Sequence, residues 1–95
     1  MKKLTMILAV LVLLTAVGCG AAPQPSAEAI TRQEAEAIAL TDAGLTAEEV
    51  QGLRTSYEVD DGLPEYEVEF YHDRWEYEYT IHAETGTILS FDKDR

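Results

Sequence analysis

Two runs of alternating glutamate and apolar side chains constrain the fold of this chain more than any other feature. Residues 65–70 read Glu-Tyr-Glu-Val-Glu-Phe, and residues 75–81 read Trp-Glu-Tyr-Glu-Tyr-Thr-Ile. A period of two is typical of strands that bury one face. A two-residue turn at 73–74 pairs Phe70 with Tyr77 and Glu69 with Glu78, which places every apolar residue on the same face. Because a slip of one residue would set rings against carboxylates, the alternation fixes the parity of the pairing.

Two further segments read as strands. Residues 53–59 alternate Leu, Thr, Tyr and Val with polar side chains, and the turn signal Asp-Asp-Gly-Leu-Pro follows at 60–64. A short last strand is expected at 87–91, after a turn at 83–86. The sequence therefore predicts four antiparallel strands.

A helix is expected before the strands. Thr31 and Glu34 have the spacing of a capping box, and Gly44 offers a left-handed stop. The residues on the predicted inner face are Ala35, Ile38, Ala39 and Ala43. Leu40 lies off that stripe, so we expect it to meet a flank or a loop. A second box at 46–49 predicts one helical turn through about Val50. The expected fold is α+β, with one N-terminal helix packed on a four-stranded antiparallel sheet whose other face is left to water.

The N-terminal eighteen residues have the layout of a signal peptide. Two lysines precede an apolar stretch at 4–14, and small residues at 16–18 precede Cys19, the single cysteine. A membrane-spanning helix needs about 20 apolar residues, so a retained anchor helix is the weaker interpretation. The Ala-Val-Gly-Cys segment at 16–19 resembles the bacterial lipoprotein box. This resemblance implies cleavage before Cys19 and acylation of that cysteine with chains such as palmitate; the alternative is an ordinary secretory peptide.

This interpretation divides the chain into three parts. Residues 1–18 form the lipoprotein signal peptide, residues 19–29 a flexible tether rich in Ala and Pro, and residues 30–95 the folded domain. The expected location is the extracytoplasmic side of a bacterial cell membrane, held by the lipid anchor.

The charge of the mature chain restricts its partners. Cleavage removes two of the seven basic residues and none of the 18 acidic ones, which leaves a formal net charge of −13. Nucleic acid is excluded as a partner, because phosphate contacts need clustered Lys and Arg. Basic proteins and cations are favoured by the sign of the charge, although acidity that only keeps a secreted domain soluble is the plainer explanation.

No catalytic pattern is present in the sequence. There is no His-Glu-x-x-His segment, no glycine-rich phosphate loop, and no calcium-loop pattern around 60–62. The alternation sends His72 and His82 to opposite sides of the hairpin, which argues against a shared metal or an acid–base pair. With Cys19 acylated, thiol chemistry is excluded as well. We therefore expect no enzyme, no cofactor and no dedicated metal ligands.

The strongest candidate site is a face of carboxylates. Glu67, Glu69, Glu76 and Glu78 share the polar side of the predicted hairpin, and like charges across a ladder are destabilising. One explanation is an exposed face that solvent screens and that discourages aggregation. The alternatives are a docking surface for a basic partner or a loose Ca²⁺ site.

Three segments together resemble the PepSY domain family. They are the Glu-Ala-x-x-Ile-Ala-Leu helix within 31–44, the Tyr-Glu-Val-Glu-Phe strand at 66–70, and the Tyr-Thr-Ile-His-Ala-Glu-Thr-Gly-Thr-Ile-Leu segment at 79–89. The resemblance covers Ile30 to about Asp92, with His82 standing where the family usually has Asp. It implies a noncatalytic extracytoplasmic module that inhibits or regulates peptidases, and the expected partner is a peptidase or another envelope protein. An acidic, Ca²⁺-binding envelope lipoprotein is the alternative.

Overall fold

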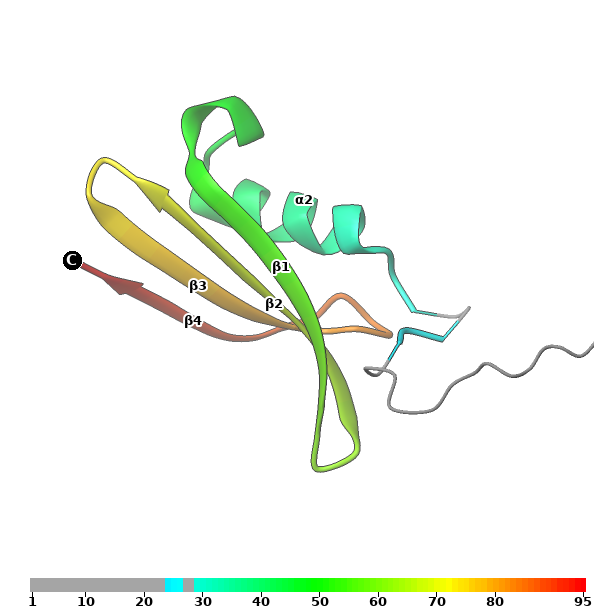
Figure 1. The fold of residues 1–95 in the computed structure, drawn as a ribbon. Helices are drawn as coiled ribbons and strands as arrows, with labels where there is room; N and C mark the ends of the chain where they lie inside the picture. Colours follow the sequence, from blue (N-terminus) through cyan, green and yellow to red (C-terminus); the bar gives the residue numbers. More distant parts are fainter. Residues whose placement is uncertain (1–23, 27–28) are drawn as a thin grey trace, which may run out of the picture.

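A computed structural model describes residues 24–26 and 29–95. In it, one helix packs on a four-stranded antiparallel sheet (Figure 1). The elements are α2 (Arg32–Ala43), the 3₁₀ turn η2 (Ala47–Glu49), β1 (Gln51–Asp60), β2 (Leu63–His72), β3 (Trp75–His82) and β4 (Ile88–Asp94). The strands are ordered β1-β2-β3-β4 in the sheet. The predicted fold class is therefore confirmed. The predicted signal peptide, Cys19 and most of the predicted tether lie outside the described residues.

Helix α2 begins and ends where its capping residues predict. The Thr31 hydroxyl accepts a hydrogen bond from the Glu34 N–H at 3.0 Å, and the Thr31 N–H donates to Glu34 Oε1 at 2.7 Å. At the other end Gly44 is left-handed, with φ 75°. The second capping segment forms η2, as expected. In the described part of the chain, no helix has the length and apolar character needed to cross a membrane.

The buried side of α2 differs from the predicted stripe. Ala35, Ala39 and Leu40 are buried, whereas Ile38 is only half-buried. The expectation that Leu40 meets a flank or a loop is therefore wrong. Leu40 belongs to the hydrophobic core cluster together with Ala35 and Ala39, so the buried side of the helix is rotated toward Leu40. Ile38 instead turns toward the segment before β4, where its Cδ1 lies 3.1 Å from the position that a Cβ would take at Gly86.

Both tight hairpins contain two residues with positive φ. Asp73 and Arg74 have φ 56° and 72°, and the β2–β3 register has the predicted pairs Phe70–Tyr77, Val68–Tyr79 and Tyr66–Ile81. Asp61 and Gly62 have φ 52° and 79°, and β2 begins at Leu63. The turn is therefore shorter than the segment 60–64, because two residues with positive φ suffice to reverse a twisted antiparallel pair.

Strand β4 is longer than the sequence suggests. We expected it at 87–91, but it runs from Ile88 to Asp94. The Lys93 ammonium lies 4.7 Å from the Trp75 ring centroid and 5.2 Å from that of Tyr77, while the Arg95 guanidinium lies 4.3 Å from Trp75. These cation–π contacts align the charged end of the chain with β3 and extend the pairing.

The core lies between α2 and the aromatic face of β2 and β3. Its largest fully buried side chains are Tyr66, Tyr79, Phe70, Ile81 and Val68. Tyr66 donates a hydrogen bond to the Ile30 carbonyl at 2.9 Å, and Tyr79 donates to Asp42 Oδ2 at 3.0 Å. The helix packs mainly over β1 and β2, so β4 lies away from it (Figure 1). Phe91 of β4 is accordingly 46% exposed.

Candidate functional site

The candidate site is the sheet face opposite α2, which we call the acidic face. The register of the four strands sends carboxylates from every strand to this side. They are Glu58 and Asp60 of β1, Glu65, Glu67 and Glu69 of β2, Glu76 and Glu78 of β3, and Asp92 and Asp94 of β4. The expected face of four glutamates is therefore part of a wider surface that spans the sheet.

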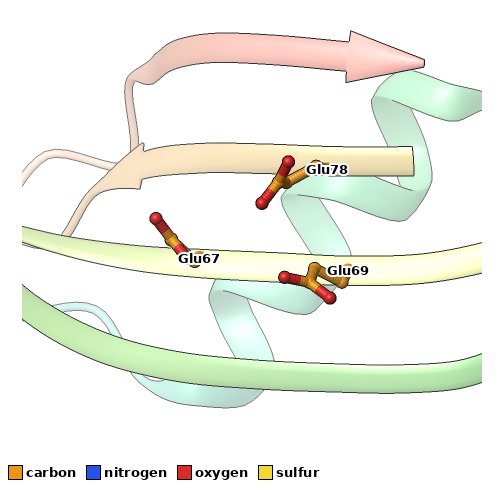
Figure 2. A group of neighbouring side chains, drawn as sticks. All are labelled: Glu67, Glu69 and Glu78. Atoms are coloured by element: carbon orange, nitrogen blue, oxygen red, sulfur yellow. The ribbon is translucent and has the colours of Figure 1, made fainter. Parts of the chain in front are cut away.

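Three of the four predicted site residues form a compact cluster. Glu69 stands opposite Glu78 across the ladder, as the alternation predicts, and Glu67 lies beside them. One carboxylate oxygen from each of the three lies within 4.8 Å of the others (Figure 2). Glu76 is not part of this cluster. It is paired with Asp94 of β4 and lines a polar recess nearer that edge.

Three carboxyl groups of this face, those of Glu65, Glu67 and Glu78, have a raised pKa. Partial burial raises the pKa of Glu67 and of Glu78, and neighbouring carboxylates raise both further. Glu65 is only 9% exposed, and burial, followed by the charges of Asp60 and Glu58, raises its pKa too. Both causes disfavour the charged form. We expected this face to be left to water, but several of its side chains are partly buried, although no helix among the described residues covers it.

Arg54 supplies a cation that the sequence analysis missed. Its guanidinium forms an ion pair with Glu69, and this carboxylate raises the pKa of Arg54. The alternation of β1 places Arg54 on the polar side, but the pairing with Glu69 depends on the β1–β2 register. The two-residue turn at Asp61 and Gly62 sets that register, which runs without a break from Asp60–Leu63 to Arg54–Glu69. The longer turn expected at 60–64 did not define it.

The cluster is suited to binding the cationic head of a basic side chain. Arg54 already demonstrates the contact, with a guanidinium nitrogen on a carboxylate oxygen. Ca²⁺ takes six to eight oxygen ligands, and three carboxylates supply at most six. One of the three already pairs with Arg54, so fewer oxygens remain for a metal ion. The geometry therefore favours a basic partner over a calcium ion.

The two histidines lie on different faces, as expected. His72 is paired with Trp75 on the aromatic side, and His82 with Glu65 on the acidic side. His82 Nδ1 accepts the Glu84 N–H at 3.1 Å, which fixes the ring at the turn. In 24–26 and 29–95, the cluster of Glu67, Glu69 and Glu78 is the one grouping of three or more potential metal-ligating side chains.

Comparisons with known proteins identify a family and one uncharacterized relative. The sequence model of the PepSY family, described as "Peptidase propeptide and YPEB domain", matches residues 29–92. An uncharacterized protein, Spy1430 of Streptococcus pyogenes serotype M6, is 38% identical over 60 residues. The match covers 63% of this chain and 46% of that protein, so the chain spans less than half the length of this relative. No solved structure matches the chain.

Proposed function

The chain belongs to the PepSY family, and on this premise we propose that it is a noncatalytic interaction module that is anchored outside the cell membrane and regulates a peptidase. The family match covers essentially all of the folded domain, and its description names peptidase propeptides. A propeptide acts by binding its enzyme, so a binding surface is the feature that such a module needs.

The observation that carries the proposal is the ion pair between Arg54 and Glu69 on the acidic face. Glu67 and Glu78 lie beside this pair and have no cation of their own among the hydrogen bonds and ion pairs of the described residues. A partner that presents Lys or Arg would supply the missing charges. It would also remove the repulsion between the two carboxyl groups, which gives the contact a physical driving force.

Binding tests this proposal with the full-length chain. The protein is cross-linked in detergent-solubilised envelope, and captured peptidases are identified and assayed. Changing Glu67→Gln with Glu78→Gln should reduce capture, whereas Glu48→Gln with Asp61→Asn removes the same charge from exposed positions outside the acidic face and should leave it unchanged. Equal capture by both variants, or a captured peptidase whose activity the protein does not alter, would contradict the proposal.

The membrane location has its own test. In the proposal Cys19 is acylated after removal of residues 1–18. The mature chain has a formal net charge of −13, so anionic lipid headgroups repel it and the lipid alone holds it at the membrane. Metabolic labelling with palmitate should mark the wild-type protein and place it in the membrane fraction. The Cys19→Ala variant should lose both the label and the membrane association. An unlabelled wild-type protein would refute the lipid anchor.

A calcium-binding function is the second candidate, favoured by the 4.8 Å grouping of three carboxylates. Calorimetry with CaCl₂ at constant ionic strength distinguishes it from the first. A true site gives saturable heat that the Glu67→Gln and Glu78→Gln changes remove. Heat that does not saturate indicates diffuse attraction to a charged surface and leaves the basic partner as the ligand.

A further inference from the structure

The two edges of the sheet differ in how well they are protected. At the β1 edge, Arg32 donates a hydrogen bond to the Thr55 carbonyl, and Thr55 Oγ1 donates to Glu36 Oε2 at 2.6 Å. In the described part of the chain, no side chain bonds to the backbone of β4 within Ile88–Asp94, and no strand lies beyond it. Every β4 residue after Ile88 is exposed. Both β1 and β4 lack an outer neighbour, and β4 is the more open of the two edges.

Exposed apolar side chains make this open edge unusual. Leu89 and Phe91 are 42% and 46% exposed, and Phe91 stacks on the Tyr79 ring at a centroid distance of 4.6 Å. Lys93 folds back over Trp75 and Tyr77, so its stem extends the apolar surface. An unpaired edge that shows apolar groups tends to recruit another strand.

The two faces beside β4 have opposite character. On the helix side, a shallow groove of about 370 Å³ with a mostly apolar surface separates α2 from the start of β4. Its lining residues are Ala37, Ile38, Thr41, Asp42 and Ile88. On the other side, a polar recess of about 360 Å³ is formed by β3 and β4. Its lining residues are Glu76, Glu78, Asp92, Lys93 and Asp94.

We propose that β4 binds an extended partner segment as a fifth strand, and that this segment alternates apolar and basic side chains. Successive side chains of a strand point to opposite faces. The apolar side chains of the segment would therefore cover Phe91 and the groove on the helix side. Its basic side chains would contact Asp92 and Asp94 on the acidic side. Backbone hydrogen bonds would supply affinity, and the alternation would supply specificity. The proposal rests on the proposed function and adds a second contact surface for the same partner, at the β4 edge and beside the cluster of Glu67, Glu69 and Glu78.

A second copy of the chain fits this edge poorly. Each copy presents Asp92 and Asp94 on the acidic side of β4, so joining two β4 edges would add these carboxylates to one surface. The mature chain also carries −13, which opposes close association of two copies. Charge complementarity thus selects a basic partner segment.

Peptides of defined pattern test the proposal on the full-length protein. The probe is a capped octapeptide that alternates Val and Lys, and its matched control has the same composition in two blocks, four Val and then four Lys. The alternating peptide should bind about tenfold more tightly, because it alone can match both faces at once. It should also slow amide hydrogen exchange in β4. Equal affinities, or unchanged exchange in β4, would overturn strand addition.

A charge reversal on β4 provides the second arm. Asp92→Lys with Asp94→Lys should shift the preference from the Val-Lys peptide to an alternating Val-Glu peptide by about tenfold in each direction. Glu48→Lys with Asp61→Lys makes the same change in net charge away from β4 and should keep the original preference. Circular dichroism checks that each variant is folded. An unchanged preference in the β4 variant would refute the site.

Failure of this inference can be separated from failure of the proposed function. If the wild-type chain captures a peptidase and Asp92→Lys with Asp94→Lys does not weaken capture, β4 is not the docking edge, but the interaction module stands. If no peptidase is captured while the alternating peptide binds at β4, the edge is confirmed and peptidase regulation is wrong. Self-association through β4 in sedimentation would overturn the basic partner.

Discussion

At the scale of single residues, protonation of Glu67 and Glu78 links pH to stability. Both groups have a pKa raised above the ordinary value of 4.5, first by burial and then by neighbouring carboxylates. A group whose pKa is higher in the folded state binds protons more tightly there than in the unfolded state. The stability that it contributes is complete below the ordinary pKa and is lost as pH rises through the folded value. The free energy of unfolding should therefore increase as pH falls from 7 toward about 5.

Chemical denaturation across this pH range measures the effect. The Glu67→Gln and Glu78→Gln double variant should be more stable than wild type at pH 7, by about 1 kcal/mol, because it removes like charges from neighbouring strands. Its stability should also depend less on pH. Glu69 is left intact because it pairs with Arg54. A double variant that keeps the full pH dependence would show that other groups cause it.

The Tyr79 hydroxyl is a second point where one atom affects the fold. It donates to Asp42 Oδ2 at 3.0 Å and so connects the end of α2 to the sheet. Tyr79→Phe should lower the free energy of unfolding by about 1.5 kcal/mol, as is usual for a hydrogen bond to a charged acceptor. Tyr57→Phe is the matched control, because the half-buried Tyr57 ring contacts Tyr66 edge-on at 5.5 Å and its hydroxyl forms no hydrogen bond among the described residues. Equal losses in urea denaturation would rule out this role for the hydroxyl.

At the scale of elements, features that depend on neighbouring residues were predicted from the sequence, and features that depend on distant residues were not. The β2–β3 register was predictable because rings and glutamates alternate on both sides of a short turn. The last residues of β4 were not predictable from the sequence. Charged residues such as Lys93 are typical of a solvated tail, and only the structure places Lys93 over the Trp75 ring. The burial of Leu40 depends on how α2 is rotated against the sheet, which helix periodicity alone does not fix.

The candidate site follows the same rule. The pairing of Glu69 with Glu78 lies within one hairpin and was predicted from the alternation. The ion pair with Arg54 joins residues 15 positions apart on two strands, and their pairing depends on a two-residue turn that the sequence placed less closely, at 60–64. The contribution of Asp92 and Asp94 to the acidic face depended on the true end of β4. Long-range strand pairing is thus what sequence analysis lacked.

The end of β4 gives a prediction at this scale. Trp75 is the one tryptophan of the chain, and Lys93 and Arg95 lie over its ring. Lys93→Ala with Arg95→Ala should increase acrylamide quenching of Trp75 fluorescence and cost about 1 kcal/mol of stability. Arg74→Asn is the control, because Arg74 is adjacent in sequence and its exposed side chain has no cation–π contact with the ring. Unchanged quenching in the double variant would place the end of β4 away from Trp75.

At the scale of the whole molecule, the two faces of the sheet have opposite requirements. The aromatic face is buried under α2 only over part of its width, and the opposite face gathers carboxylates from all four strands. Repulsion on the acidic face lowers the stability of the free domain. In the proposed function the same charges attract a basic partner, and binding would then offset the stability that this repulsion costs. This arrangement accounts for an acidic surface that folding alone does not favour.

Salt should therefore change stability and binding in opposite directions. The screening length falls from about 10 Å at 0.1 M salt to about 3 Å at 1 M, which weakens repulsion between carboxylates on the acidic face. The melting temperature of the free protein should rise with NaCl, while its affinity for an alternating Val-Lys peptide should fall. In the Glu67→Gln and Glu78→Gln variant both slopes should be smaller, since fewer charges remain to be screened. A melting temperature that falls with NaCl would show that the carboxylates do not strain the sheet. An affinity independent of NaCl would show that charge does not drive docking.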